Sequence, residues 1–123
     1  MTRIAVVEDN PDNRLLVRAI LEDRYGVLEY EDGPSALEGL RTDRPDVVLL
    51  DISLPGMDGV TVLREIRRDE ALRGLPVIAL TAHAMAGDRE KYLKEGFDDY
   101  LTKPILDETE LTSAIERWRG GSR

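Results

Sequence analysis

The sequence of 123 residues contains no cysteine and only one histidine, His83. Without cysteine the chain forms no disulfides, thiolate metal sites or iron–sulfur clusters, and a cysteine nucleophile is excluded. A single histidine likewise excludes a zinc site built from several histidines of one chain. Much of the known range of metal and thiol chemistry is therefore outside the reach of this protein.

Long apolar runs are missing as well. The longest, such as residues 47–50, fall far short of the roughly 20 residues that cross a bilayer. The first eight residues lack the basic, apolar and cleavage regions of a secretory signal. We therefore expect a cytoplasmic protein without a membrane segment.

Positive charge is in the minority, with 17 Lys and Arg against 25 Asp and Glu and a net charge of −8. This balance argues against direct nucleic-acid binding, because such affinity comes largely from Lys and Arg. A hydrophobic share of 41% with 34% charged residues is typical of a globular protein. The length supports one domain, which we expect at residues 1–119, followed by a short flexible tail at residues 120–123.

Five apolar stretches alternate with five amphipathic patterns along the chain. The first, third and fourth stretches are continuously apolar, which favours strands that are buried on both faces of a parallel sheet. The expected strands are residues 4–7, 27–30, 47–50, 77–80 and 100–101. This order predicts an α/β fold with an open, doubly wound parallel sheet and helices on both faces.

The helices are expected from apolar residues at helical spacing. The clearest stripes are Leu15, Leu16, Ala19 and Ile20; Leu37 and Leu40; Val62, Leu63 and Ile66; and Leu111, Ala114, Ile115 and Trp118. The fifth strand is short, and the helix expected over residues 84–95 begins without a sharp cap.

Several turn residues suggest where these helices begin and end. Asn10 before Pro11 is typical of a helix start, and Asp107 resembles the cap of a capping box. Residues 31–33 look like the entry turn of the second helix. Three glycines follow helical patterns, where a left-handed residue would end the helix: Gly26, Gly74 and Gly96.

The polar residues that follow the predicted strands suggest a functional site. Ligands of open α/β sheets bind at the carboxyl ends of the strands, where this chain has Glu8, Asp9, Asp51, Thr81 and Lys103. Clustered carboxylates raise one another's pKa or require a cation, and oxygen ligands without His or Cys suit Mg²⁺ better than zinc. With a hydroxyl and an ammonium nearby, such a site can accept a phosphoryl group on Asp51.

Four motifs occur at the ends of these strands: VEDN at residues 7–10, DVVLLDISLPGMDG at 46–59, ALTA at 79–82 and LTKP at 101–104. As an ordered set they resemble the response-regulator receiver domains of two-component signalling over nearly the entire chain. The resemblance implies the flavodoxin-like receiver fold, a doubly wound five-stranded parallel sheet in the order 2-1-3-4-5 with five flanking helices. Within the family, the segment around residues 81–88 resembles receivers of hybrid histidine kinase phosphorelays.

The resemblance also implies a role for each matching site residue. Asp51 is similar to the phosphoacceptor, Glu8 and Asp9 to the acidic pair that binds Mg²⁺, and Ser53 to the residue whose backbone carbonyl completes the metal shell. Glu8 stands where many members have Asp. The residue two positions after the acceptor, Ser53, also influences how long the phosphoryl group survives.

Further positions match on the other side of the expected site. The resemblance implies that Thr81 and Lys103 contact the phosphoryl oxygens and that the peptide bond between Lys103 and Pro104 is cis. Tyr100 matches the aromatic switch position, which would act together with Thr81. His83, two positions after Thr81, is a second tuning position.

Taken singly, most of these residues have simpler interpretations. Asp51 is consistent with an acidic turn residue, Thr81 with a strand-end hydroxyl bonded to backbone, and Lys103 with a solvated surface charge. Tyr100 is consistent with a strand aromatic whose hydroxyl lies at the rim, and His83 with a partly exposed loop residue. The joint occurrence of these residues, in this order, favours the functional interpretation.

The resulting hypothesis is a stand-alone response regulator. Asp51 would take a phosphoryl group from a histidine kinase or histidine phosphotransfer protein, with Mg²⁺ required. The phosphorylated form would bind a downstream protein through the face built from the fourth helix, fifth strand and fifth helix. Such a protein assists its own phosphoryl transfer and dephosphorylation but is not an enzyme with a substrate of its own.

Two alternatives remain open from the residues alone. One is a phosphorylation-independent binding module on the same scaffold. The other is a Mg²⁺-dependent phosphohydrolase, which needs a general acid–base residue and a substrate lid that the sequence does not clearly place.

Overall fold

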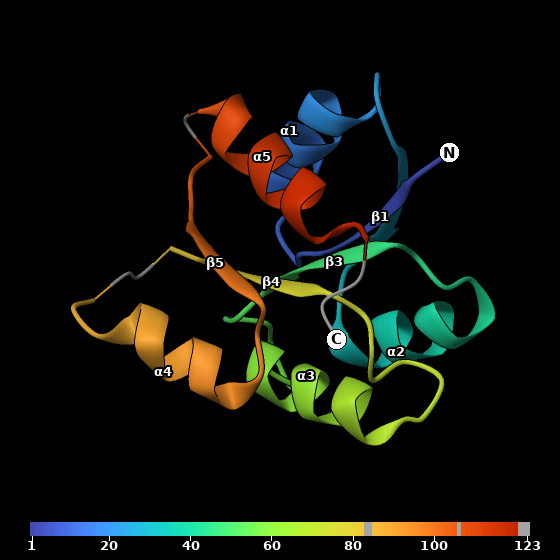
Figure 1. The fold of residues 1–123 in the computed structure, drawn as a ribbon, viewed down its shortest axis with the longest axis vertical. Coiled ribbons are helices and arrows are strands. Elements are labelled where there is room, and N and C mark those ends of the chain that lie inside the picture. Colours follow the sequence, from blue (N-terminus) through green and yellow to red (C-terminus); the bar gives the residue numbers. More distant parts are fainter. Residues whose placement is uncertain (83–84, 106, 121–123) are drawn as a thin grey trace.

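The computed structural model describes residues 1–82, 85–105 and 107–120. Strands and helices alternate along the chain (Figure 1). Their bounds are β1 (Arg3–Val7), α1 (Pro11–Leu21), β2 (Gly26–Tyr30), α2 (Gly33–Thr42), β3 (Val47–Asp51), α3 (Gly59–Arg68), β4 (Val77–Thr81), α4 (Asp88–Glu95), β5 (Asp99–Thr102) and α5 (Glu108–Trp118). The expected alternation is confirmed. No helix in the described part of the chain is long and apolar enough to cross a membrane.

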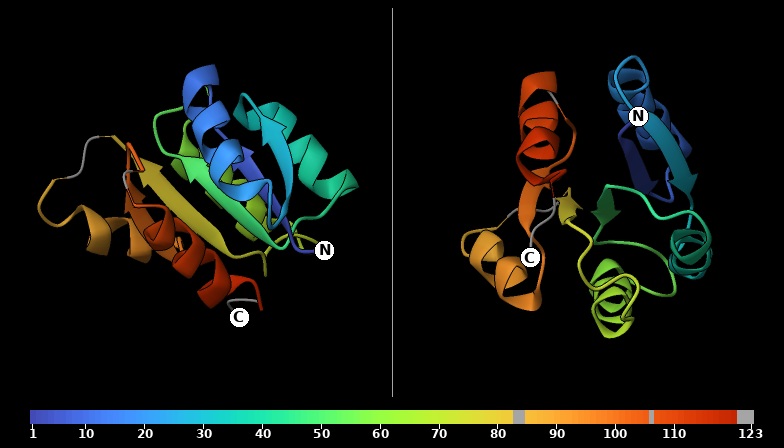
Figure 2. Two further views of the ribbon diagram at one scale, coloured as in Figure 1. Left: turned by 90° about the horizontal axis from the view of Figure 1, so that it is seen from above. Right: turned by 45° about the vertical axis from the view of Figure 1, so that its right-hand side comes forward.

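The strands form one parallel sheet in the order β2-β1-β3-β4-β5. Helices α1 and α5 cover one face, and α2, α3 and α4 cover the other (Figures 1 and 2). The register pairs Val7 with Leu50 and Leu50 with Ala79, which aligns the carboxyl ends of the central strands. The expected doubly wound α/β architecture is therefore confirmed, including the strand order that the family resemblance implied.

Alternate residues of the central strands face two separate cores, which is the physical reason for their continuously apolar sequence. On one face the strands pack against α1 and α5, and on the other they pack mainly against α2 and α3. The first core includes Ile4, Val6, Leu49, Ile78, Leu111 and Ile115, and the second includes Ala5, Val7, Leu50, Val62, Leu63 and Ile66. These strands cannot move without disturbing both layers.

The prediction for α1 was wrong about which residues are buried. Its core residues are Val17 and Leu21, whereas Leu15 is 65% exposed and Leu16 is 42% exposed. Ile20 is half-buried against the core. Several helical stripes on α1 are apolar, and the helix turns the stripe containing Val17 and Leu21 toward the sheet. The other expected stripes do contribute buried side chains.

Most helix starts follow the expected capping chemistry. The side chain of Asn10 accepts hydrogen bonds from the amides of Asp12 and Asn13, and Pro11 opens α1. The carboxylate of Asp32 similarly caps α2 through Ser35. Asp107 caps α5 through the amide of Thr109, two residues on, rather than through the third residue of a capping box.

The predictions for helix ends were correct for one glycine of three. Gly96 ends α4 with a left-handed φ of 120°. Gly26 and Gly74 have no left-handed backbone: Gly26 is the first residue of β2, and α3 ends earlier, with Asp69 as its cap. A turn of several residues separates each of these helices from the next strand, so no single left-handed residue has to reverse the chain.

Candidate functional site

The expected site residues meet at the carboxyl edge of the sheet. Glu8 and Asp9 follow β1, Asp51 ends β3, Thr81 ends β4 and Lys103 follows β5. Carboxylate oxygens of Glu8, Asp9 and Asp51 all lie within 4.8 Å of one another. Residues far apart in the sequence are thus brought to one point because parallel strands end at the same edge.

Lys103 links two of these carboxylates directly. Its Nζ lies 2.8 Å from Oε2 of Glu8 and 3.1 Å from Oδ2 of Asp51. The backbone amide of Lys103 donates to the carbonyl of Thr81 at 2.7 Å, which fixes the start of the β5–α5 connection beside β4. The following peptide bond, between Lys103 and Pro104, is cis.

Asp51 is held on both sides. One oxygen, Oδ2, faces Lys103, and the other, Oδ1, accepts a hydrogen bond from the backbone amide of Ser53 at 3.0 Å. Asp51 is only 2% exposed and Glu8 only 1%, whereas Asp9 is exposed. The cluster therefore has two buried carboxylates below and one carboxylate at the entrance.

The electrostatics of this cluster are unbalanced, because three carboxylates face the single ammonium of Lys103. Burial raises the pKa of Glu8, and the negative charge of Asp51 adds to this effect, while the bond to Lys103 opposes it. For Lys103, burial acts to lower the pKa, but its bonds to Glu8 and Asp51 outweigh burial and raise it. Excess negative charge with oxygen ligands suits a hard divalent cation such as Mg²⁺.

The backbone carbonyl of Ser53 was expected to contribute to metal binding, and this role stays a prediction. Ser53 is exposed at the edge of the cluster, and its amide already bonds to Asp51. His83, which was expected to be a second tuning position, lies outside the described residues. The proposed boundary between the domain and its tail, at residues 119–120, also stays a prediction.

Thr81 and Tyr100 lie on the side of the site formed by β4 and β5. Thr81 is buried, and Tyr100 is half-buried with its ring stacked on Tyr92 of α4 at a centroid distance of 5.9 Å. The hydroxyl oxygen of Tyr100 is buried and has no hydrogen-bond partner among the described residues. It is therefore not at the rim, as the simpler interpretation of Tyr100 expected, and burial raises its pKa.

Two residues important for the site geometry were not identified from the sequence. A Cβ atom added to Gly59, the first residue of α3, would lie 2.4 Å from the carbonyl oxygen of Asp51, so only glycine lets the start of this helix approach Asp51 so closely. Arg14 of α1 donates to the carbonyls of Glu8 and Asp9. The glycine was part of a quoted motif, but no pattern pointed to the arginine.

Curated proteins of two kinds are similar to this chain. The sensor histidine kinase GacS of Pseudomonas protegens is 43% identical over 122 residues, which cover 96% of this chain and 13% of that protein. The polar-differentiation response regulator DivK of Brucella anthropi is 41% identical over 103 residues, which cover 83% of this chain and 84% of DivK. The chain thus spans only about an eighth of the kinase but most of the response regulator.

Solved structures show the same fold. The receiver domain of the sensor histidine kinase PA1611 from Pseudomonas aeruginosa PAO1 is 42% identical and superposes with a TM-score of 0.87, covering 97% of this chain and 98% of that one. In that crystal structure a magnesium ion is coordinated in the active-site cleft. The family model of the response regulator receiver domain matches residues 4–116. This chain belongs to the response-regulator receiver domain family.

Proposed function

We propose that Asp51 accepts a phosphoryl group from a phosphohistidine of a histidine kinase or histidine phosphotransfer protein, in a reaction that requires Mg²⁺. The observation that carries this proposal is the position of the Asp51 carboxylate. It is buried at the carboxyl edge of the sheet, between the ammonium of Lys103 and the amide of Ser53, and within 4.8 Å of two further carboxylates.

In the proposed transfer, an oxygen of Asp51 forms a bond to phosphorus while the bond between phosphorus and the donor imidazole breaks. Lys103 lies close enough to Asp51 to stabilise negative charge on the transferred group, and Thr81 lies at the end of the neighbouring strand. The carboxylates of Glu8, Asp9 and Asp51 and the carbonyl of Ser53 would hold Mg²⁺. When bound, that ion neutralises charge on the phosphoryl oxygens.

The switch proposed for the phosphorylated form uses the side of the site near β5. A phosphoryl group adds about −1.5 to −2 charges and strong acceptor oxygens beside Thr81. Attraction of the Thr81 hydroxyl would leave space for the Tyr100 ring, whose hydroxyl gains no hydrogen bond from a described residue in its buried position. The face formed by α4, β5 and α5 would then bind its protein partner differently.

The relatives include both arrangements of a receiver. DivK supports the stand-alone role expected from the sequence, and GacS supports a receiver that works within a histidine kinase. The proposed chemistry at Asp51 is the same in both. We propose a phosphoacceptor signalling protein rather than an enzyme that turns over a small substrate.

Intact-mass spectrometry tests the proposal directly. The full chain is incubated with Mg²⁺ and acetyl phosphate, and we expect one labile phosphoryl adduct that disappears with a chelator and in Asp51→Asn. Asp58→Asn is the matched control, because Asp58 is a nearby exposed carboxylate that caps α3 and Asn caps helices equally well. A folded wild-type protein that binds Mg²⁺ without gaining an adduct would contradict the proposal and favour a phosphorylation-independent binding module.

A further inference from the structure

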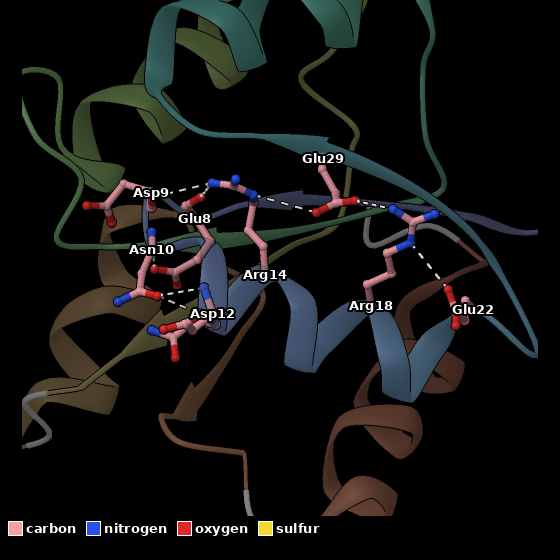
Figure 3. A network of polar contacts seen from close by, with 9 residues as sticks. Glu8, Asp9, Asn10, Asp12, Arg14, Arg18, Glu22 and Glu29 are labelled. Atoms are coloured by element: carbon pink, nitrogen blue, oxygen red, sulfur yellow. Dashed lines mark hydrogen bonds and ion pairs between the residues drawn. The ribbon is translucent and has the colours of Figure 1, made fainter.

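Arg14 connects the metal-binding side of the site to the edge of the sheet. From the first half of α1, its Nη1 donates to the carbonyl oxygen of Glu8 at 2.8 Å and to that of Asp9 at 3.3 Å. On the other side of the guanidinium, Nε lies 3.6 Å from Oε1 of Glu29. Figure 3 shows the guanidinium between the two acidic residues and Glu29. The side chain is only 20% exposed.

Glu29 is itself held in place. It lies on β2, and its second oxygen, Oε2, bonds to Nη1 of Arg18 at 3.0 Å, one turn after Arg14 on α1. Arg18 also pairs with Glu22 at the end of the helix (Figure 3). The planar guanidinium of Arg14 is thus oriented by a carboxylate on one side and presents its donors to the loop on the other.

The loop between β1 and α1 has to bring two consecutive acidic side chains close together. Glu8 and Asp9 are consecutive residues, and successive side chains of an extended chain point in opposite directions. Their carboxylate oxygens nevertheless lie within 4.8 Å of each other. The backbone must therefore turn between them, and the carbonyls of this turn are the groups that Arg14 binds. A charge-assisted bond to a carbonyl is stronger than a neutral one.

We propose that Arg14 is a positioning residue for Mg²⁺ binding, which it assists by fixing the backbone that carries Glu8 and Asp9. This inference rests on the proposed function, because it assumes that these carboxylates bind the ion. Arg14 bonds to the backbone of the acidic pair, whereas Lys103 bonds to the carboxylate of Glu8. The two cations therefore have different effects: one organises the ligands, and the other competes with the ion for their charge.

The sign of the effect distinguishes positioning from simple electrostatics. Arg14 is a positive charge close to the cluster, so its removal alone would make the site more attractive to Mg²⁺. If Arg14 positions the ligands, its removal weakens binding instead. Loss of groups that orient metal ligands typically weakens metal affinity by about ten-fold or more. The proposal therefore predicts that the loss of a nearby positive charge reduces the affinity for a cation.

In the experiment, the full chain is titrated with Mg²⁺ at constant ionic strength, and binding is measured by calorimetry or amide NMR. We expect Arg14→Gln to raise the Kd about ten-fold. Arg41→Gln is the matched control, since it removes an equal charge from α2, where Arg41 bonds to Asp69 at 2.9 Å, outside the network of Arg14, Arg18 and Glu29. We expect its Kd to stay within about two-fold of wild type. Arg14→Lys keeps the charge but not the fork of donors, and should be intermediate.

The outcomes are distinct. A Kd for Arg14→Gln that equals or falls below that of wild type, in a protein whose thermal unfolding shows it to be folded, overturns the proposal. Equal weakening by Arg41→Gln overturns it as well. The phosphoryl adduct with acetyl phosphate is measured in parallel: Arg14→Gln should regain wild-type uptake at saturating Mg²⁺. If wild type binds Mg²⁺ but gains no adduct, the proposed function fails while the Mg²⁺ titrations still decide the role of Arg14.

Discussion

Two buried aspartates, Asp51 and Asp99, have different surroundings in this fold. Asp51 ends β3 at the carboxyl edge of the sheet, and Asp99 begins β5. They are similarly buried, with exposed fractions of 2% and 3%. Asp99, however, is surrounded by donors: Oδ1 accepts from its neighbour's amide and from Arg89, and Oδ2 accepts from Arg117 and the indole of Trp118 at 2.9 Å each.

The difference lies in the balance of charge. Two arginines surround one carboxylate at Asp99, whereas one ammonium faces three carboxylates around Asp51. Buried charge without compensation costs free energy, so a fold retains it where function requires it. Asp99 connects α4, β5 and α5 through its hydrogen bonds, whereas Asp51 belongs to the cluster proposed to bind an external cation.

The largest effect should separate the two aspartates by chemistry. Asp51→Asn should abolish phosphoryl uptake from acetyl phosphate, because the substituted amide is not a nucleophile for phosphorus. Asp99→Asn should still gain the Mg²⁺-dependent adduct, because Asp99 lies outside the carboxylate cluster. Intact-mass spectrometry of both variants checks this. A complete loss of uptake in a folded Asp99→Asn protein would show that the two regions are not separate in function.

The next effect concerns the cores on either side of the sheet, which support both aspartates. Leu63 of α3 and Ile115 of α5 have no exposed surface and belong to different cores. Leu63→Ala and Ile115→Ala should each reduce the free energy of unfolding by about 2–5 kcal/mol, through lost burial and a remaining cavity. Urea denaturation measures this. The exposed Leu15→Ala is the control, and its change should be within about 0.5 kcal/mol.

A smaller effect tests whether Asp99 is structural. Asp99→Asn keeps one acceptor oxygen but replaces the other with an NH₂ group, which faces hydrogen-bond donors and cannot accept from them. We expect a loss of about 1–3 kcal/mol in unfolding free energy. The arginine partners add little of this, because both of their side chains are more than half exposed. Asp51→Asn should be neutral or stabilising instead, since it removes one negative charge from the cluster. Urea denaturation of both variants in chelator decides this; equal destabilisation would contradict the comparison.

The sequence was sufficient to predict the parts of the molecule that follow from periodicity and strand ends. Continuous apolar stretches indicated the central strands, and the polar residue after each stretch indicated the site. Arg14 was not predicted, because its role depends on a bond between a side chain and the backbone of another segment. The exposed position of Leu16 was missed for a related reason: tertiary packing decided which stripe of α1 faces the sheet. Pattern alone contains neither kind of information.

The smallest effect compares two glutamates with opposite surroundings. Burial raises the pKa of Glu8 above its ordinary value of 4.5. The hydrogen bond from the Tyr25 hydroxyl, 2.6 Å long, lowers the pKa of Glu116 below the same value. A raised folded-state pKa means that the native state binds more protons than the unfolded state above pH 4.5, so the contribution of Glu8 to stability falls as pH rises through its raised pKa. The contribution of Glu116 is fully present above pH 4.5 and is lost as pH falls through its lowered pKa.

These opposite signs give the last prediction. In chelator, Glu8→Gln should flatten the decline in stability above pH 4.5, whereas Glu116→Gln should flatten the decline below it. Thermal unfolding of both variants and wild type across this pH range measures the slopes. The effects are small because the bond to Lys103 opposes the shift at Glu8 and because Glu116 lies at the surface. If the ionised carboxylates bind Mg²⁺ as proposed, its addition should remove the decline due to Glu8 and leave that of Glu116 unchanged. Identical slopes for the two variants would show that the two acidic regions do not differ in charge balance.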